Sequence, residues 1–94
     1  MKAAHAGDAK KFTDIPNIGR RMEQDFRQLG MHVPSDLIGK DPFQLYQKMC
    51  RLSGVRQDPC VLDTYMAAVA FMEGAPAKAW WVYTPIRKKQ HPIL

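Results

Sequence analysis

The chain has 94 residues, enough for one domain with a modest hydrophobic core. Hydrophobic residues make up 46% and charged residues 24% of it, which excludes global disorder, and no apolar run approaches the roughly 20 residues that span a membrane. Fourteen Lys and Arg residues against nine Asp and Glu residues give a net charge of +5, which favours polyanionic partners.

Residues 1–10 are small and polar and show no apolar period, so they predict a loose N-terminal tail. This start lacks the apolar core of a secretion signal. Cys50 and Cys60 lie at no CxxC spacing, and without a signal peptide we expect them to be reduced thiols in the cytoplasm.

A short helix, a turn and a longer helix are predicted next. Asp8 can cap a short helix over residues 9–14, and Pro16 and Gly19 then mark a turn. The apolar period becomes helical over residues 20–29, and the glycine that follows suits a left-handed cap, so a helix is predicted there.

The same order of a short helix, a turn and a longer helix is predicted again for residues 35–53. Ser35 can cap a very short helix through Ile38, which Gly39 stops. Asp41, followed by proline, is a strong start signal for a longer helix, and Ser53 with the next glycine ends it.

The most apolar segment of the chain, CVLDTYMAAVAFMEG, follows a second cap of this kind at Asp58. Its apolar residues cover nearly every side of the predicted helix, which indicates a core helix or one that also serves a dimer interface. Gly74 and Pro76 end this helix.

The end of the chain is predicted to be irregular. Residues 77–81 are expected to add one helical turn carrying Trp80 and Trp81, and residues 83–94, with two prolines and a basic cluster, to form an extended tail. No segment alternates strongly enough for a β-sheet. The fold class is therefore all-α, with a compact helical domain over residues 11–82.

The turn before the second predicted helix has the chemistry of an anion site. Ile15 and Ile18 would anchor it in the core, and Gly19 permits either a positive φ or the close approach of another molecule. Amides at the start of the next helix lack internal partners and lie at the positive end of its dipole. Arg20 and Arg21 add positive charge, so the pattern favours phosphate binding without base readout.

The sequence IPNIG at residues 15–19 resembles the helix-hairpin-helix motif of DNA-binding and DNA-repair proteins, whose hairpin usually reads apolar-x-Gly-apolar-Gly. Asn17 replaces the first glycine, and asparagine is the residue best able to substitute at positive φ. The resemblance implies that DNA phosphate is bound by the following residues: Asn17, Ile18, Gly19, Arg20 and Arg21.

A second, degenerate hairpin is similar to the same motif around Gly39 and Lys40. It has one glycine, and Asp41 would lie close to a bound phosphate, which is unfavourable. A purely structural role for this hairpin therefore stays open.

The order of four segments, IPNIG, DLIGKDPFQLYQKMC, DPCVLDTYMAAVAFMEG and WW, is similar to that of a family of small bacterial helix-hairpin-helix proteins. These proteins are named for a pathogenicity locus or for mitomycin resistance. The similarity covers residues 11–81. It implies a helix-hairpin-helix fold in a bacterial cytoplasm but no particular activity, because the names record genetic context.

Two functions from different classes remain open. The first is sequence-independent DNA binding through the hairpin, with residues 87–89 adding general attraction. The second is a protein-interaction or homodimerisation module without DNA contact, which would use the apolar face of residues 61–72 and the two tryptophans.

An enzyme is not expected, because no acid, base or nucleophile set can be assembled. Cys60 could have a lowered pKa at a helix N-terminus, but no histidine has a position that suggests a partner. No Cys, His or Asp cluster has metal-ligand spacing. We therefore expect no metal, cofactor, membrane or small-molecule substrate.

Overall fold

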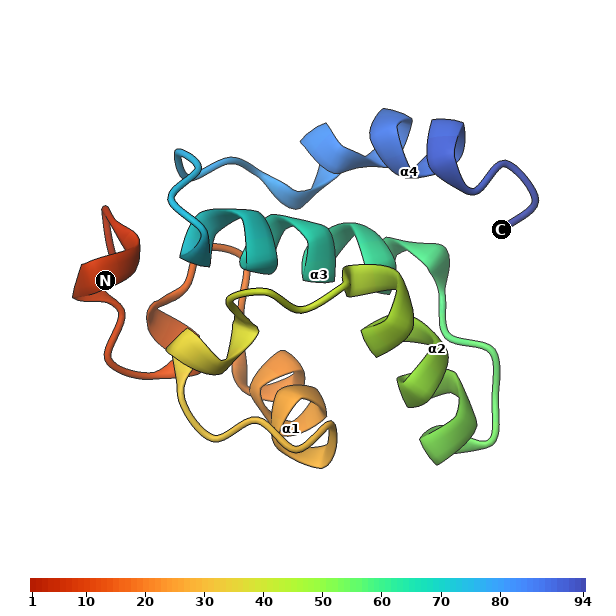
Figure 1. The fold of residues 1–94 in the computed structure, drawn as a ribbon, viewed down its shortest axis with the longest axis horizontal. Coiled ribbons are helices and arrows are strands. Elements are labelled where there is room, and N and C mark those ends of the chain that lie inside the picture. Colours follow the sequence, from red (N-terminus) through yellow and green to blue (C-terminus); the bar gives the residue numbers. More distant parts are fainter.

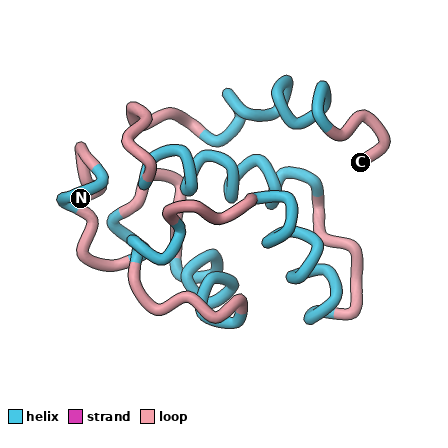
Figure 2. The backbone as a smooth tube through the Cα atoms, in the orientation of Figure 1, coloured by secondary structure: helices cyan, strands magenta, loops and turns pink.

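Four α-helices joined by short 3-10 helices make up the chain, which contains no β-strand, as the sequence predicted (Figures 1 and 2). The computed structural model describes residues 1–94. The α-helices are α1 (Arg20–Gln28), α2 (Pro42–Ser53), α3 (Pro59–Met72) and α4 (Thr84–Gln90). The 3-10 helices are η1 (Ala6–Asp8), η2 (Phe12–Asp14), η3 (Pro34–Leu37) and η4 (Trp80–Tyr83).

α2 and α3 begin where the sequence predicts their caps. The Asp41 carboxylate accepts a hydrogen bond from the Phe43 amide at 2.9 Å, and the Asp58 carboxylate accepts one from the Cys60 amide at 2.8 Å. Proline fills the first position of both helices, where a missing N–H costs no hydrogen bond. Each cap contributes about 1 kcal/mol to stability.

α3 is the centre of the fold. In Figure 1 it crosses the molecule, with α4 on one side and α1 and α2 on the other. Ten of its 14 residues are buried, which explains why its sequence is apolar nearly all round. The face of residues 61–72 is thus mostly covered within one chain, which leaves little of it for a dimer contact.

The turn before α1 is anchored in this core. Ile15 and Ile18 are fully buried, as predicted. The Phe26 ring of α1 packs against Phe12 on one side and Tyr65 of α3 on the other, with ring centroids 5.3 Å and 5.4 Å apart. Apolar contacts therefore hold both the turn and the helix that follows it.

The C-terminal segment differs from the sequence prediction, because residues 84–90 form α4 rather than an extended tail. Arg87 is buried, and its guanidinium donates to the Asp63 carboxylate of α3. This pair joins residues 24 positions apart, so no local pattern could reveal it. Arg87 is consequently unavailable to attract DNA.

The N-terminal residues also make contacts that their composition did not predict. The Ala3 amide donates to the Asp14 carbonyl at 2.7 Å, so the start of the chain lies against η2. The short helix predicted over residues 9–14 begins only at Phe12.

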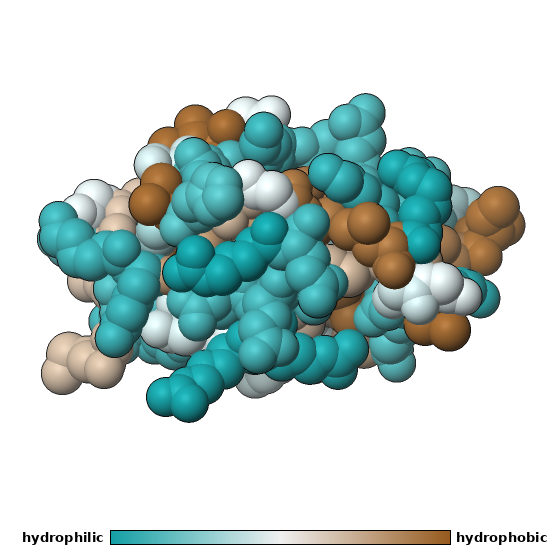
Figure 3. All heavy atoms as spheres, turned by 90° about the horizontal axis from the view of Figure 1, so that it is seen from below, coloured by the Kyte–Doolittle hydropathy of each residue, from teal (hydrophilic) through white to brown (hydrophobic).

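The surface is mainly hydrophilic on one face. Figure 3 views the molecule from the side of α1 and α2, where hydrophilic side chains cover most of the surface and apolar ones gather toward the edges.

The longest helix, α3, has 14 residues, and none of the helices combines the length and apolar composition that a membrane crossing requires.

Candidate nucleic-acid interface

Two segments, which we name the first turn unit (residues 10–20) and the second turn unit (residues 32–42), repeat the same local geometry. Asp14 in the first and Asp36 in the second each accept hydrogen bonds from the amides three and four residues earlier, at 2.8–3.1 Å. These backbone hydrogen bonds favour the charged form and lower the pKa of both carboxyls. The side chain that organises η3 is therefore Asp36 and not the predicted Ser35.

Each unit continues into a four-residue turn, at residues 15–18 and 37–40. In both turns the fourth amide donates to the first carbonyl at 3.1 Å. The third residue has a positive φ, +72° at Asn17 and +81° at Gly39. The prediction that Asn17 takes over the glycine conformation is confirmed, and asparagine accepts it because its short polar side chain tolerates the left-handed region.

The two units differ at the helix that follows. α1 begins after Gly19, which has no capping side chain, whereas α2 begins with the Asp41 cap. The amides of Gly19, Arg20 and Arg21 consequently have no acceptor within the protein. Free N–H groups at the positive end of a helix dipole form a favourable environment for an anion.

Gly19 is exposed and extended, with φ −103° and ψ −171°, a conformation that any residue adopts. The interpretation that Gly19 provides a positive φ is therefore wrong. A Cβ atom at Gly19 would meet no atom within 4 Å. Internal packing does not require glycine here, and the open surface lets another molecule approach the backbone closely.

The protein's own carboxylates occupy the second turn. The Gly39 amide donates to the Glu73 carboxylate just beyond α3, at 2.9 Å, and the Asp41 carboxylate caps α2 beside Lys40. Two negative charges thus lie where a phosphate would have to bind. This geometry favours a structural role for Gly39 and Lys40.

The predicted phosphate-binding residues form one continuous stretch from the first turn into α1. Ile18 is fully buried and its amide is used by the turn, so it supports the site from inside. Arg20 and Arg21 are exposed, and neither forms an ion pair. Arg21 donates to the neutral Gln57 side chain at 3.4 Å, which leaves its charge uncompensated.

Two distant lysines that the sequence analysis missed also meet the first turn. The Asn17 side chain donates to the Lys78 carbonyl at 2.8 Å and accepts from the Trp80 amide at 3.3 Å. The Lys2 ammonium donates to the Ile18 carbonyl and to a carbonyl of η2. Neither lysine lies in a pattern that points to the turn, so only the tertiary contacts could find them.

The two cysteines are free. Cys60 is exposed, and hydrogen bonding of its thiol to the Asp58 carboxylate raises the pKa of Cys60, whereas the sequence suggested a lowered value. The Cys50 sulfur accepts a hydrogen bond from the Gln57 amide at 3.4 Å. No group of three or more His, Cys, Asp and Glu side chains is arranged to hold a metal ion.

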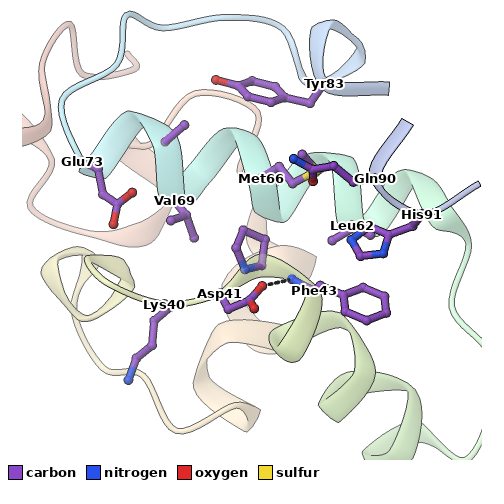
Figure 4. A pocket seen from close by; sticks show the side chains of 12 residues that line it. Lys40, Asp41, Phe43, Leu62, Met66, Val69, Glu73, Tyr83, Gln90 and His91 are labelled. Atoms are coloured by element: carbon purple, nitrogen blue, oxygen red, sulfur yellow. Dashed lines mark hydrogen bonds between the residues drawn. The ribbon is translucent and has the colours of Figure 1, made fainter. Parts of the chain in front are cut away.

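A groove of about 290 Å³ lies between α2, α3 and α4. Figure 4 shows Leu62, Met66 and Val69 of α3 along its apolar floor. Both of its carboxylates are engaged by backbone amides, Asp41 as the cap of α2 and Glu73 at the second turn. Both carboxylates of the groove therefore help to hold the fold together.

Known proteins resemble this chain over most of its length. The family model described as Cdd1, pathogenicity locus, matches residues 5–89. The mitomycin resistance protein McrB of Streptomyces lavendulae is 42% identical over 84 residues, which are 89% of this chain and 80% of that protein. The resemblance to pathogenicity-locus and mitomycin-resistance-like proteins is thereby confirmed. No solved structure matches the chain.

Proposed function

This chain belongs to the pathogenicity-locus family, and we propose that it binds the phosphate backbone of DNA, without reading the bases, through the first turn and the start of α1. The amides of Gly19, Arg20 and Arg21 would donate to phosphate oxygens, and the two arginine side chains would add long-range attraction. Duplexes of different sequence would then bind alike. Such a helix-hairpin-helix protein would act in the bacterial cytoplasm.

The observation that carries this proposal is the difference between the starts of α1 and α2. Both helices follow turns of the same geometry. The second start is closed by Asp41 and Glu73, whereas the first presents free amides and two uncompensated arginines. A purely structural turn would gain about 1 kcal/mol from a capping side chain, so its absence at an exposed, cationic helix start favours an external anion.

Fluorescence anisotropy with labelled short duplexes and single strands, across a salt series, tests the proposal. We expect duplex affinity to fall linearly with the logarithm of salt concentration and to be insensitive to sequence. Arg20→Ala and Arg21→Ala should each weaken binding to every duplex and reduce the salt slope by about one.

Arg51→Ala is the matched control, because it removes the same charge from the exposed last turn of α2. This variant should keep the wild-type salt slope. No binding at low salt, or equal losses for all three arginine variants, would contradict a site at the first turn.

A protein-interaction module is the second candidate, favoured by an exposed apolar patch on η4 and α4. The exposed fractions are 62% for Trp81, 42% for Val82 and 43% for Ile86. Light scattering would show a dimer that Trp81→Ala dissociates, and a monomer at all concentrations would exclude self-association through this patch.

A further inference from the structure

We propose that the groove between α2, α3 and α4 binds a small amphipathic amine, with the apolar body of the ligand on the groove floor and its ammonium group at Glu73. This inference goes beyond the proposed function and does not depend on it, since the groove and the first turn share no residue. The sequence predicted no small-molecule substrate, and the groove exists only through tertiary packing, because its lining comes from segments between residues 40 and 91.

The floor of the groove is one apolar stripe of α3. Leu62, Met66 and Val69 lie at positions i, i+4 and i+7, so they share one side of the helix. The stripe is about 10 Å long, at about 1.5 Å per residue. Met66 is only partly buried, unlike most of α3. The groove volume of about 290 Å³ is close to the lower end of the range for small-molecule sites.

The two ends of the floor differ in chemistry. At one end the rings of Phe43 and His91 stack, with their centroids 4.0 Å apart. At the other end Glu73 directly follows α3. Figure 4 shows the aromatic pair and the carboxylate at opposite ends of the floor. An apolar molecule with one polar terminus therefore matches the groove better than a molecule that is polar throughout.

The charge of the groove selects a cation. Its lining holds two carboxylates, Asp41 and Glu73, and one lysine, Lys40, although the chain has a net charge of +5. Each carboxylate accepts a backbone amide with one oxygen, and its other oxygen has no partner within the protein. Figure 4 shows the Lys40 side chain directed away from the floor, and Lys40 forms no ion pair. The two negative charges are therefore uncompensated and attract a positive group.

Glu73 is the better ammonium partner of the two acids. It lies at the C-terminal end of α3, where the helix dipole favours a positive charge, whereas Asp41 lies at the N-terminal end of α2, where the dipole offsets its charge. An ammonium group can donate to the free oxygen of Glu73 while the Gly39 amide keeps the other. The apolar body then extends along the floor toward the aromatic pair.

Titration with phenylbutylamine, followed by nuclear magnetic resonance of the backbone amides, tests the inference. Phenylbutanol and phenylbutyrate are matched probes, because they carry a similar body with a neutral or a negative terminus. The amine should shift amides that line the groove and bind about three- to fivefold tighter than the alcohol, and the acid should bind more weakly than the alcohol. Equal affinities of amine and alcohol, or shifts confined to other surfaces, would overturn the inference.

Glu73→Gln removes the charge but keeps an acceptor for the Gly39 amide. The variant should lower the affinity for the amine about three- to fivefold and leave the affinity for the alcohol unchanged. Asp8→Asn in η1 is the matched control, because it removes the same charge outside the groove, and it should change neither affinity. Equal losses in the two variants would show only a general attraction to the protein's acids and contradict the site.

Ala70 lies partly buried in the lining, so Ala70→Phe should fill the groove and abolish the binding of both amine and alcohol. Binding that persists in this variant, with an unchanged circular dichroism spectrum, would place the ligand elsewhere.

A blocked lysine, with its backbone amine acetylated and its carboxyl amidated, distinguishes a free amine from the side chain of a partner protein. It should bind more weakly than phenylbutylamine, because it lacks the ring. Tighter binding of the blocked lysine would assign the groove to a protein partner and overturn the inference. None of these measurements contains DNA, so this inference and the proposed function can fail separately.

Discussion

Arg87 of α4 and Asp63 of α3 form a buried ion pair in which the guanidinium donates twice to the carboxylate, at 2.9 Å and 3.2 Å. Thr84 donates a third hydrogen bond to the same carboxylate at 2.7 Å. These contacts satisfy the fully buried Asp63, and its hydrogen bonds raise the pKa of Arg87 above the ordinary value. α4 is thus attached to the core largely through one carboxylate.

Asp63→Ala should therefore destabilise the protein. The substitution leaves the Arg87 guanidinium buried without a partner, and we expect the free energy of unfolding to fall by about 3 kcal/mol. Urea denaturation followed by circular dichroism measures this change. Lys88→Ala, on the exposed side of α4, should change it by less than about 0.5 kcal/mol. Equal effects of the two substitutions would show that α4 does not depend on the ion pair.

Gly19→Asp should separate stability from DNA binding. The backbone at Gly19 already has an extended conformation suited to a capping residue, and an added Cβ atom meets no atom within 4 Å. We expect the free energy of unfolding to stay constant or rise by about 0.5 kcal/mol, because aspartate caps α1 and complements its dipole. Duplex binding should be lost in anisotropy, since the carboxylate then occupies the phosphate position. Retained wild-type affinity would place DNA elsewhere.

Asn17→Ala should cost about 2–3 kcal/mol of unfolding free energy in chemical denaturation. Alanine is strained at a φ of +72°, and the substitution removes the hydrogen bonds to Lys78 and Trp80. Asn17→Gly relieves the strain but still loses both bonds, so about 1–2 kcal/mol is expected. If both variants are equally stable, the left-handed conformation contributes nothing.

Acid should destabilise the protein through its capping carboxylates. Backbone hydrogen bonds hold the pKa of Asp14 and of Asp36 below the ordinary value of 3.8, and the bond from the Cys60 amide does the same for Asp58. The pKa of each of these carboxyls is lower in the folded protein than in the unfolded chain. Their contribution to the free energy of unfolding is therefore complete above the unfolded-state pKa and is lost as the pH falls through the folded-state pKa.

Unfolding free energies measured between about pH 6 and about pH 2.5 should therefore stay level at first and decline from near pH 4 downward. The double variant Asp14→Asn, Asp36→Asn should show a shallower decline, because its two amide side chains do not titrate. An unchanged acid profile in the double variant would assign the pH dependence to other groups.

The three longer helices, α1, α2 and α3, could be predicted from local signals. Asp41 and Asp58, each followed by proline, mark the starts of α2 and α3 within one residue, and the left-handed conformation of Asn17 agrees with its place in the turn. Caps, prolines and positive-φ residues act within a few positions, so their effect is present in the local sequence.

The amino-acid sequence by itself determined that the chain is all-α, that two turn units precede two helices, and that the first is the more cationic. Only the tertiary structure decided that α4 exists, that Glu73 closes the second turn, and that Lys2 and Lys78 flank the first. The reason is distance along the chain. These contacts join residues from 16 to 61 positions apart, and such pairings depend on how the helices pack around α3 rather than on any period or cap.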